Sequence, residues 1–127
     1  MRKLSINIVK TAKFLANYRS RLERGIIAQT TVWYNTNTKE IVEFGMVFNT
    51  AYKWSIDKDG ELPGYVLTNA FDVQDIDTHE AGHALMLEDL YMAEANALTM
   101  YGYGSYGQTC AISLGVGDIS GVKAVYP

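Results

Sequence analysis

The chain has 127 residues, of which 48% are hydrophobic and 20% are charged, and its formal net charge is −3. This length and composition fit one globular domain with a real core, and they exclude a repeat or low-complexity protein. We expect a single α+β domain over residues 1–127. The lone Cys110 excludes an internal disulfide, and we expect it to be a small buried residue rather than a nucleophile.

Charge is unevenly distributed along the chain. Residues 1–24 hold seven basic residues against one acid, so this stretch carries +6 and the remainder −9. Apolar residues recur near helical spacing between Ile8 and Leu22, which favours an amphipathic helix packed on the sheet over a basic arm for nucleic acid or anionic membranes. Lys10 and Lys13 interrupt any signal-peptide core, and no stretch reaches transmembrane length.

Two runs rich in β-branched and aromatic residues, 26–34 and 41–48, are typical of strands. The polar segment NTNT at 35–38 reads as a turn, so the two runs predict an antiparallel hairpin. Residues 54–56 predict a further short strand. The acidic segment DKDGE at 57–61 follows as a plain turn, which we prefer over a calcium loop because it lacks the full ladder of oxygen ligands.

Both histidines of the chain lie in one HEAGH sequence, His79 to His83. On a helix, residues four apart share a face, so the two rings can direct nitrogens at one cation. Glu80 lies beside the pair, where it can handle the proton of an activated water without being a ligand. Asp72 is placed to cap the start of this helix.

A catalytic zinc needs a third protein ligand, and no histidine remains to supply it. If the helix continued, Glu88 would point about 180° away from His79, and Asp89 would also lie off the ligand face. The chain must therefore bend after Leu85 to bring Asp89 to the metal. Glu94 is the alternative third ligand, and we favour Asp89.

The residues His79, Glu80, His83 and Asp89 fit HExxHxxGxxD, and this pattern resembles the metzincin zinc metallopeptidases of the snapalysin type. LTMY at 98–101 resembles the Met-turn of the matrixin branch, GDISGV at 117–122 with Tyr126 resembles its last helix, and FDVQ at 71–74 resembles the start of its active-site helix. The resemblance spans residues 71–127. Met86 stands where the family has glycine, so a left-handed bend there costs about 1 kcal/mol or needs different dihedrals.

This resemblance implies a small metzincin-like domain: a twisted, mostly β sheet packed on an N-terminal helix and the active-site helix, then the Met-turn and a C-terminal helix that we expect to start at Asp118. It implies a secreted, zinc-dependent endopeptidase with one catalytic ion and a peptide or protein substrate. Met100 would form an apolar floor under the metal. Tyr101 and Tyr103 would line the substrate pocket, and the alternative is that they only pack in the fold. Of the hairpin strands, we favour 41–48 as the edge that holds an extended substrate.

The alternative function is a zinc-binding protein without proteolytic activity. Matrixin-like domains usually have more chain before the active-site helix than the 78 residues that precede His79 here, so we expect a minimal or N-terminally shortened domain. Neither a cysteine-switch propeptide nor the extra histidines of the matrixin structural zinc site is present in the sequence. No nucleic-acid partner is expected.

Overall fold

The computed structural model describes residues 2–6, 22–56 and 68–127. The expected N-terminal helix, apart from its last residue Leu22, and the 57–61 turn with its calcium alternative lie outside these described residues. What is described forms a small α+β arrangement, as the composition and patterning predict.

The predicted hairpin is confirmed. Strands β2 (Ala28–Tyr34) and β3 (Ile41–Phe48) pair antiparallel, with a bulge between Trp33 and Tyr34. Asn35 shapes the turn because its side-chain oxygen accepts from the backbone N–H groups of residues 37 and 38, at 2.9 and 3.2 Å. Such side-chain caps stabilise tight connections between strands.

A third strand lies on the other side of β2. Strand β1 (Arg2–Ile6) pairs antiparallel with β2, so the sheet order is β1-β2-β3 and β2 is central. The sequence analysis did not predict β1, because five residues with two adjacent cations carry little strand signal. Long-range pairing with a strong central strand determines this element.

A second, very short sheet leads into the main helix. Strands β4 (Trp54–Ser55) and β5 (Phe71–Asp72) pair in parallel, which confirms the short strand expected at 54–56. Aromatic rings gather around it: Trp54 lies 5.0 Å from Phe48 and 5.8 Å from Phe71, between ring centroids. This cluster fixes the point at which the helix begins.

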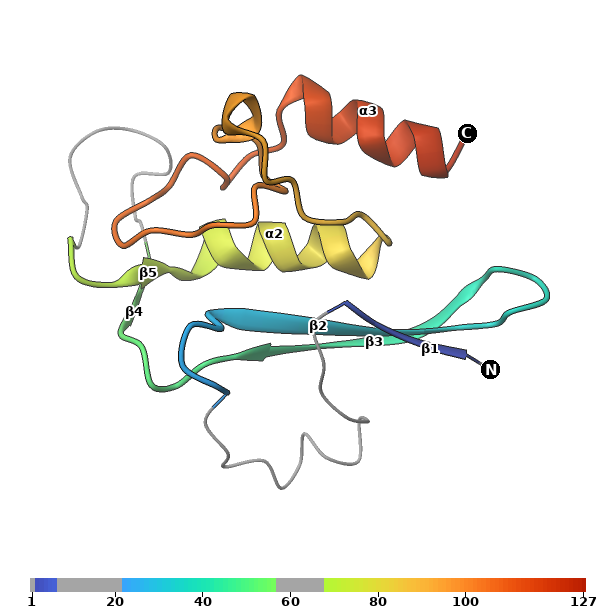
Figure 1. Ribbon diagram of the computed structural model, residues 1–127, viewed down its shortest axis with the longest axis horizontal. Coiled ribbons are helices and arrows are strands. Elements are labelled where there is room, and N and C mark those ends of the chain that lie inside the picture. The colour runs from blue at the N-terminus through green and yellow to red at the C-terminus, as the bar shows by residue number, and fades with distance from the viewer. Residues whose placement is uncertain (1, 7–21, 57–67) are drawn as a thin grey trace.

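Helix α2 (Val73–Ala84) starts at β5 with the expected cap, because the Asp72 carboxylate accepts from the backbone N–H of Asp75 at 2.8 Å. The helix crosses one face of the three-stranded sheet and lies between that sheet and the C-terminal segment (Figure 1). Its middle position explains why polar residues on several sides of α2 are buried. These are Asp75, Glu80 and His83.

The C-terminal segment contains a single 3-10 turn, η1 (Ala93–Ala95), and helix α3 (Val116–Val125). The expectation that this helix starts at Asp118 is wrong. It starts two residues earlier with Gly115 as N-cap, and Asp118 sits in the first turn, where its carboxylate accepts from the Gly115 N–H at 2.8 Å. Cys110 is exposed, so the expectation that it is buried is wrong as well.

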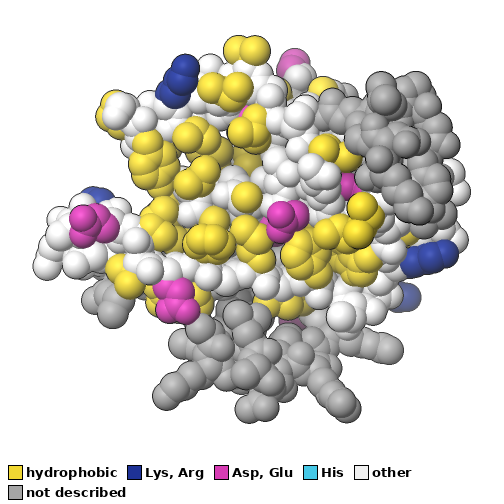
Figure 2. Space-filling view, turned by 180° about the vertical axis from the view of Figure 1, so that it is seen from behind, with side chains coloured by type: hydrophobic (Ala, Val, Ile, Leu, Met, Phe, Trp, Pro, Cys, Tyr) yellow, Lys and Arg dark blue, Asp and Glu magenta, His cyan; other side chains and the backbone are white. Residues whose placement is uncertain are grey.

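The surface seen from behind the view of Figure 1 carries a broad band of hydrophobic side chains, and no histidine is visible on that face (Figure 2). Several hydrophobic side chains of α3 and of the segment just before it are exposed, and Val116 is the most exposed at 83%. Within the described ranges, no helix is long and apolar enough to cross a membrane.

Candidate metal centre

The bend expected after Leu85 is confirmed. Helix α2 ends at Ala84, Leu85 is the C-cap, and Met86 adopts a left-handed conformation with φ of 68°. The N–H of Leu87 reaches the carbonyl of Gly82 at 3.0 Å, and that of Met86 reaches the carbonyl of His83 at 2.9 Å. This pattern is a Schellman cap with methionine where glycine is usual. Of the two possibilities that the sequence left open, the bend is therefore made with a left-handed methionine and not with different dihedral angles.

After the bend, the chain is anchored to the segment around Met100. The N–H of Leu90 donates to the carbonyl of Met100 at 2.8 Å, and the N–H of Gly102 donates to the carbonyl of Leu90 at 2.9 Å. These two bonds form a parallel bridge between Leu90 and Tyr101. Residue 89 is held next to this bridge, so its position depends on both the bend and the pairing.

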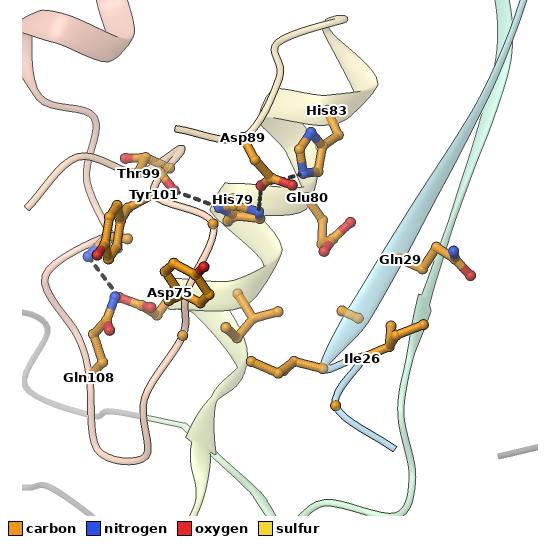
Figure 3. A pocket seen from close by; sticks show the side chains of 18 of the residues that line it. Ile26, Gln29, Asp75, His79, Glu80, His83, Asp89, Thr99, Tyr101 and Gln108 are labelled. Carbon is orange, nitrogen blue, oxygen red and sulfur yellow. Dashed lines mark hydrogen bonds and ion pairs between the residues drawn. The ribbon is translucent and has the colours of Figure 1, made fainter. Parts of the chain in front are cut away.

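The structure brings His79, His83 and Asp89 together as a group of potential metal ligands. Atom Oδ1 of Asp89 lies 3.2 Å from Nε2 of His79 and 3.3 Å from Nε2 of His83 (Figure 3). The two rings meet edge to face with centroids 4.7 Å apart. Glu94, the alternative third ligand, is not in this group: it lies exposed in η1.

The far nitrogen of each ring is held by a backbone carbonyl. Nδ1 of His79 lies 2.7 Å from the carbonyl oxygen of Thr99, and Nδ1 of His83 lies 2.7 Å from that of Leu87. A carbonyl can only accept, so both Nδ1 atoms carry a proton, and in neutral rings both Nε2 atoms present a lone pair. Two lone pairs then face a carboxylate, an arrangement that is favourable only with protons or a cation between them.

The two distances between the Asp89 carboxylate and the histidine nitrogens are compatible with zinc. Nitrogen and oxygen ligands about 2.0–2.1 Å from a tetrahedral zinc lie about 3.3–3.4 Å from one another. The two distances to Asp89 Oδ1, 3.2 and 3.3 Å, are close to that edge length. Two imidazoles and one carboxylate also match the donor set of catalytic zinc sites, which leave the fourth position open.

The same proximity perturbs ionisation. Hydrogen bonds from His79 and His83 hold the pKa of the Asp89 carboxyl far below its usual value. Burial alone lowers the pKa of His83, but its hydrogen bonds to Asp89 and to the Leu87 carbonyl outweigh burial and raise that pKa. A lowered pKa favours the ionised form of Asp89, which suits a metal ligand.

Tyr91 supports the third ligand, and sequence reasoning missed it. Its hydroxyl donates to Oδ2 of Asp89 at 3.0 Å, which leaves Oδ1 to face the two histidines. The hydrogen bond to this anion raises the pKa of Tyr91. The available signal was local: residues two apart in an extended segment point to the same side, so Asp89 and Tyr91 share a side.

Glu80 lies beside the histidines and projects toward β2 (Figure 3). It is buried, and burial raises the pKa of its carboxyl, while a hydrogen bond from Thr30 opposes that rise. The Thr30 hydroxyl on β2 lies 2.5 Å from Oε2 of Glu80. Sequence reasoning missed Thr30 because the two residues are fifty positions apart, and a threonine inside a strand carries no sign of its partner.

Met100 is buried against the helix that carries the histidines. A Cβ atom added at Gly82 would lie 2.1 Å from the sulfur of Met100, so only glycine permits this approach. The expected role of Met100 as an apolar floor under the metal stays a prediction. Asp118 helps to hold the same loop, because its carboxylate accepts from the N–H of Thr99 at 3.3 Å, and the carbonyl of Thr99 orients His79.

A cleft opens over the histidine pair. Tyr101 and Tyr103 line it as expected, with ring centroids 5.6 Å apart, and Tyr91 joins them at 5.4 Å from Tyr103. The opposite wall comes from residues 25–29, at the start of β2. Strand β3 contributes no residue to this lining but is an edge of the described three-stranded sheet, so the preference for 41–48 as the substrate-binding edge stays a prediction.

Comparison of the chain with protein-family models, with curated proteins and with solved structures found no match.

Proposed function

We propose that this domain is a zinc-dependent endopeptidase in which His79, His83 and Asp89 hold one zinc ion and Glu80 acts as general base. The single observation that carries the proposal is the convergence of three donor atoms within 4.8 Å of one another, with Asp89 Oδ1 3.2 and 3.3 Å from the two histidine nitrogens. The two carbonyl-held Nδ1 protons support it, since they leave both Nε2 atoms free to bind a cation.

Zinc held by these side chains supplies Lewis-acid activation of water and of a peptide carbonyl. The carboxylate of Glu80 then accepts the proton of the attacking water while the new carbon–oxygen bond forms. When the carbon–nitrogen bond breaks, the protonated Glu80 returns this proton to the leaving amine. A buried carboxyl with a raised pKa is suited to carry a proton in this way.

The finer identity, a small metzincin-like catalytic domain with a Met-turn, is part of the same proposal. Three features support it: the bend at Met86, the backbone bridge between Leu90 and Tyr101, and the packing of Met100 against Gly82. Each joins elements that the HExxH helix alone does not specify. An extended peptide is the substrate that fits a cleft lined on one side by tyrosines and on the other by residues 25–29.

The test combines metal analysis with peptide cleavage. Purified wild type and Glu80→Gln are loaded with zinc, their metal content is measured, and both are incubated with a mixed peptide pool. We expect one zinc per chain in both proteins and cleavage by wild type alone, because Glu80 is not a ligand. Glu88→Gln is the matched control, since Glu88 is an exposed carboxylate outside the ligand group, and it should cleave like wild type.

The other outcomes separate the alternatives. Zinc in both proteins without cleavage in either would leave the binding-only function, the second function predicted from the sequence. The element assay includes iron, because two histidines and one carboxylate also form the usual Fe(II) triad. A purified protein that takes up iron and rejects zinc would overturn the peptidase proposal, as would the absence of any bound metal.

A further inference from the structure

The side chain of Glu80 is held from the sheet rather than from its own helix. Thr30 lies on the central strand β2 and is 1% exposed, while Glu80 on α2 is 5% exposed. The Thr30 oxygen is 2.5 Å from Oε2 of Glu80 and 3.0 Å from the Glu80 carbonyl oxygen. This contact joins two elements of the buried interface between α2 and the sheet.

The single hydroxyl proton of Thr30 can serve only one of these two acceptors. Hydrogen bonds from a hydroxyl to a carboxylate are short, about 2.5–2.7 Å, and stronger than those to a neutral carbonyl. The shorter contact is the one to Oε2, so the proton lies on the bond to the carboxylate. Among the described residues, Thr30 is the hydrogen-bond donor recorded for this carboxylate.

We propose that Thr30 is a positioning residue for Glu80: its hydroxyl fixes Oε2, so that the remaining carboxylate oxygen is presented to the cleft to accept the proton of water. This inference rests on the proposed function. Glu80 lines the cleft and has three side-chain torsions, so without an anchor its carboxylate samples several rotamers. An anchor on a central strand is rigid, and a base held in one orientation transfers protons faster.

The position of Thr30 on the strand makes the role specific. Side chains alternate along a strand, so Thr31 faces away from α2 although it is similarly buried, at 4% exposure. Thr31→Val is therefore a matched control: the same chemical change, on the same strand, on the opposite face of the sheet. Thr30→Val removes the hydroxyl while keeping the branched shape, and Thr30→Ser keeps the hydroxyl.

The first arm of the test measures peptide cleavage by the zinc-loaded proteins. We expect Thr30→Val to lower kcat about 10- to 100-fold, which is part of the roughly 10²- to 10⁴-fold that a positioned general base contributes, while KM and zinc content stay at wild-type values. Thr30→Ser should restore most of kcat, and Thr31→Val should behave like wild type. Wild-type kcat in Thr30→Val, or an equal loss in Thr31→Val, would overturn the inference.

The second arm needs no activity. In metal-free protein labelled with carboxyl-¹³C glutamate, the Glu80 resonance is identified by its absence from Glu80→Gln. At fixed neutral pH, Thr30→Val should move this resonance, and Thr31→Val and Thr30→Ser should leave it near its wild-type position. An unmoved resonance in Thr30→Val would overturn the contact. If wild type cleaves nothing, the proposed function fails while this arm still decides whether Thr30 anchors Glu80.

Circular dichroism checks folding before either arm. If Thr30→Val does not fold, Thr30→Ala replaces it, because alanine removes the hydroxyl without placing a methyl group beside Oε2. Failure of both variants to fold would also overturn the inference, since the hydroxyl would then be a requirement of the fold rather than an orienting group.

Discussion

The first two metal ligands and the third reach the same point by different routes. His79 and His83 lie on regular helix, and the four-residue spacing alone puts their rings on one side. Asp89 lies beyond the helix, and it arrives only because Met86 takes a left-handed conformation and Leu90 pairs with the segment around Met100. Local geometry sets the pair, while long-range contacts set the third ligand.

This difference identifies where the site is vulnerable. The histidine pair is supported by the helix and by two backbone carbonyls, whereas Asp89 depends on a strained residue, a two-bond bridge and the Tyr91 hydroxyl. Changes to the helix ligands should remove metal binding directly. Changes to the contacts that hold Asp89 should weaken zinc binding by smaller amounts, and each decrease in affinity measures the contribution of one contact.

The largest expected effect is the loss of a ligand on either side of this comparison. His83→Ala and Asp89→Ala should each lower zinc affinity by more than about 100-fold, beyond the range typical of outer-shell changes. Competition with a chromophoric zinc chelator measures the affinity. Glu94→Ala serves as the control and should bind like wild type. Wild-type affinity in Asp89→Ala, or a loss in Glu94→Ala, would reverse the assignment of the third ligand.

The effect of pH on the stabilisation by zinc should be nearly as large as the effect of removing a ligand. The pKa of His83 is raised, so in metal-free protein its contribution to stability is present at low pH and is lost as pH rises through that pKa. Zinc needs the same nitrogen without its proton. The increase in Tm on adding zinc should therefore grow as pH rises, and below the His83 pKa zinc affinity should fall about tenfold per pH unit for this one proton.

Thermal unfolding with and without zinc, across a pH series, checks this sign. His83→Gln should show little zinc-induced increase in Tm at any pH, because this variant lacks one of the three proposed ligands. A zinc-induced increase in Tm that shrinks as pH rises would contradict the competition between proton and metal at His83.

The support from Tyr91 should have an intermediate effect. Tyr91→Phe keeps the ring and removes the hydroxyl that holds Oδ2 of Asp89, so zinc affinity should fall by about 10-fold, the lower end for outer-shell partners. Tyr103→Phe is the matched control, as its ring contacts Tyr91 and Tyr101 but no hydrogen bond to Asp89 is recorded for its hydroxyl. Equal losses in both variants would show that the hydroxyl of Tyr91 has no special role.

The smallest expected effect concerns the bend. Met86→Gly relieves the left-handed strain, about 1–2 kcal/mol, but costs about 0.5–1 kcal/mol because glycine is more flexible when unfolded. The free energy of unfolding should therefore rise by up to about 1.5 kcal/mol in urea titrations of metal-free protein. Leu85→Gly, at an ordinary φ of −89°, should lower it. A loss of stability in Met86→Gly would mean that methionine packing outweighs the strain.

Sequence reasoning succeeded where the determining contacts are local. The hairpin follows from two strand-like runs around an Asn35 turn, and α2 follows from the Asp72 cap and the histidine spacing. The bend was predicted because Asp89 could not otherwise approach the metal. Each of these features depends on residues close together in the chain.

It failed where the partner is distant or the signal is weak. Strand β1 exists because β2 pairs with it, and Thr30 approaches Glu80 only once α2 is packed on the sheet. The start of α3 was misplaced because Asp118 acts from inside the first turn, where it still satisfies the Gly115 N–H. Cys110 lies exposed although cysteine is usually buried.

X-ray absorption at the zinc edge, on zinc-loaded wild type and Asp89→Ala, tests the proposed centre most directly. Wild type should show two imidazole nitrogens and oxygen donors at about 2.0–2.1 Å, with no sulfur. In Asp89→Ala, loaded at high protein and zinc concentrations, the two imidazoles should remain and the carboxylate should be replaced by solvent. A wild-type spectrum with fewer than two imidazoles or with sulfur among the donors, or the loss of an imidazole in Asp89→Ala, would contradict a site built from His79, His83 and Asp89.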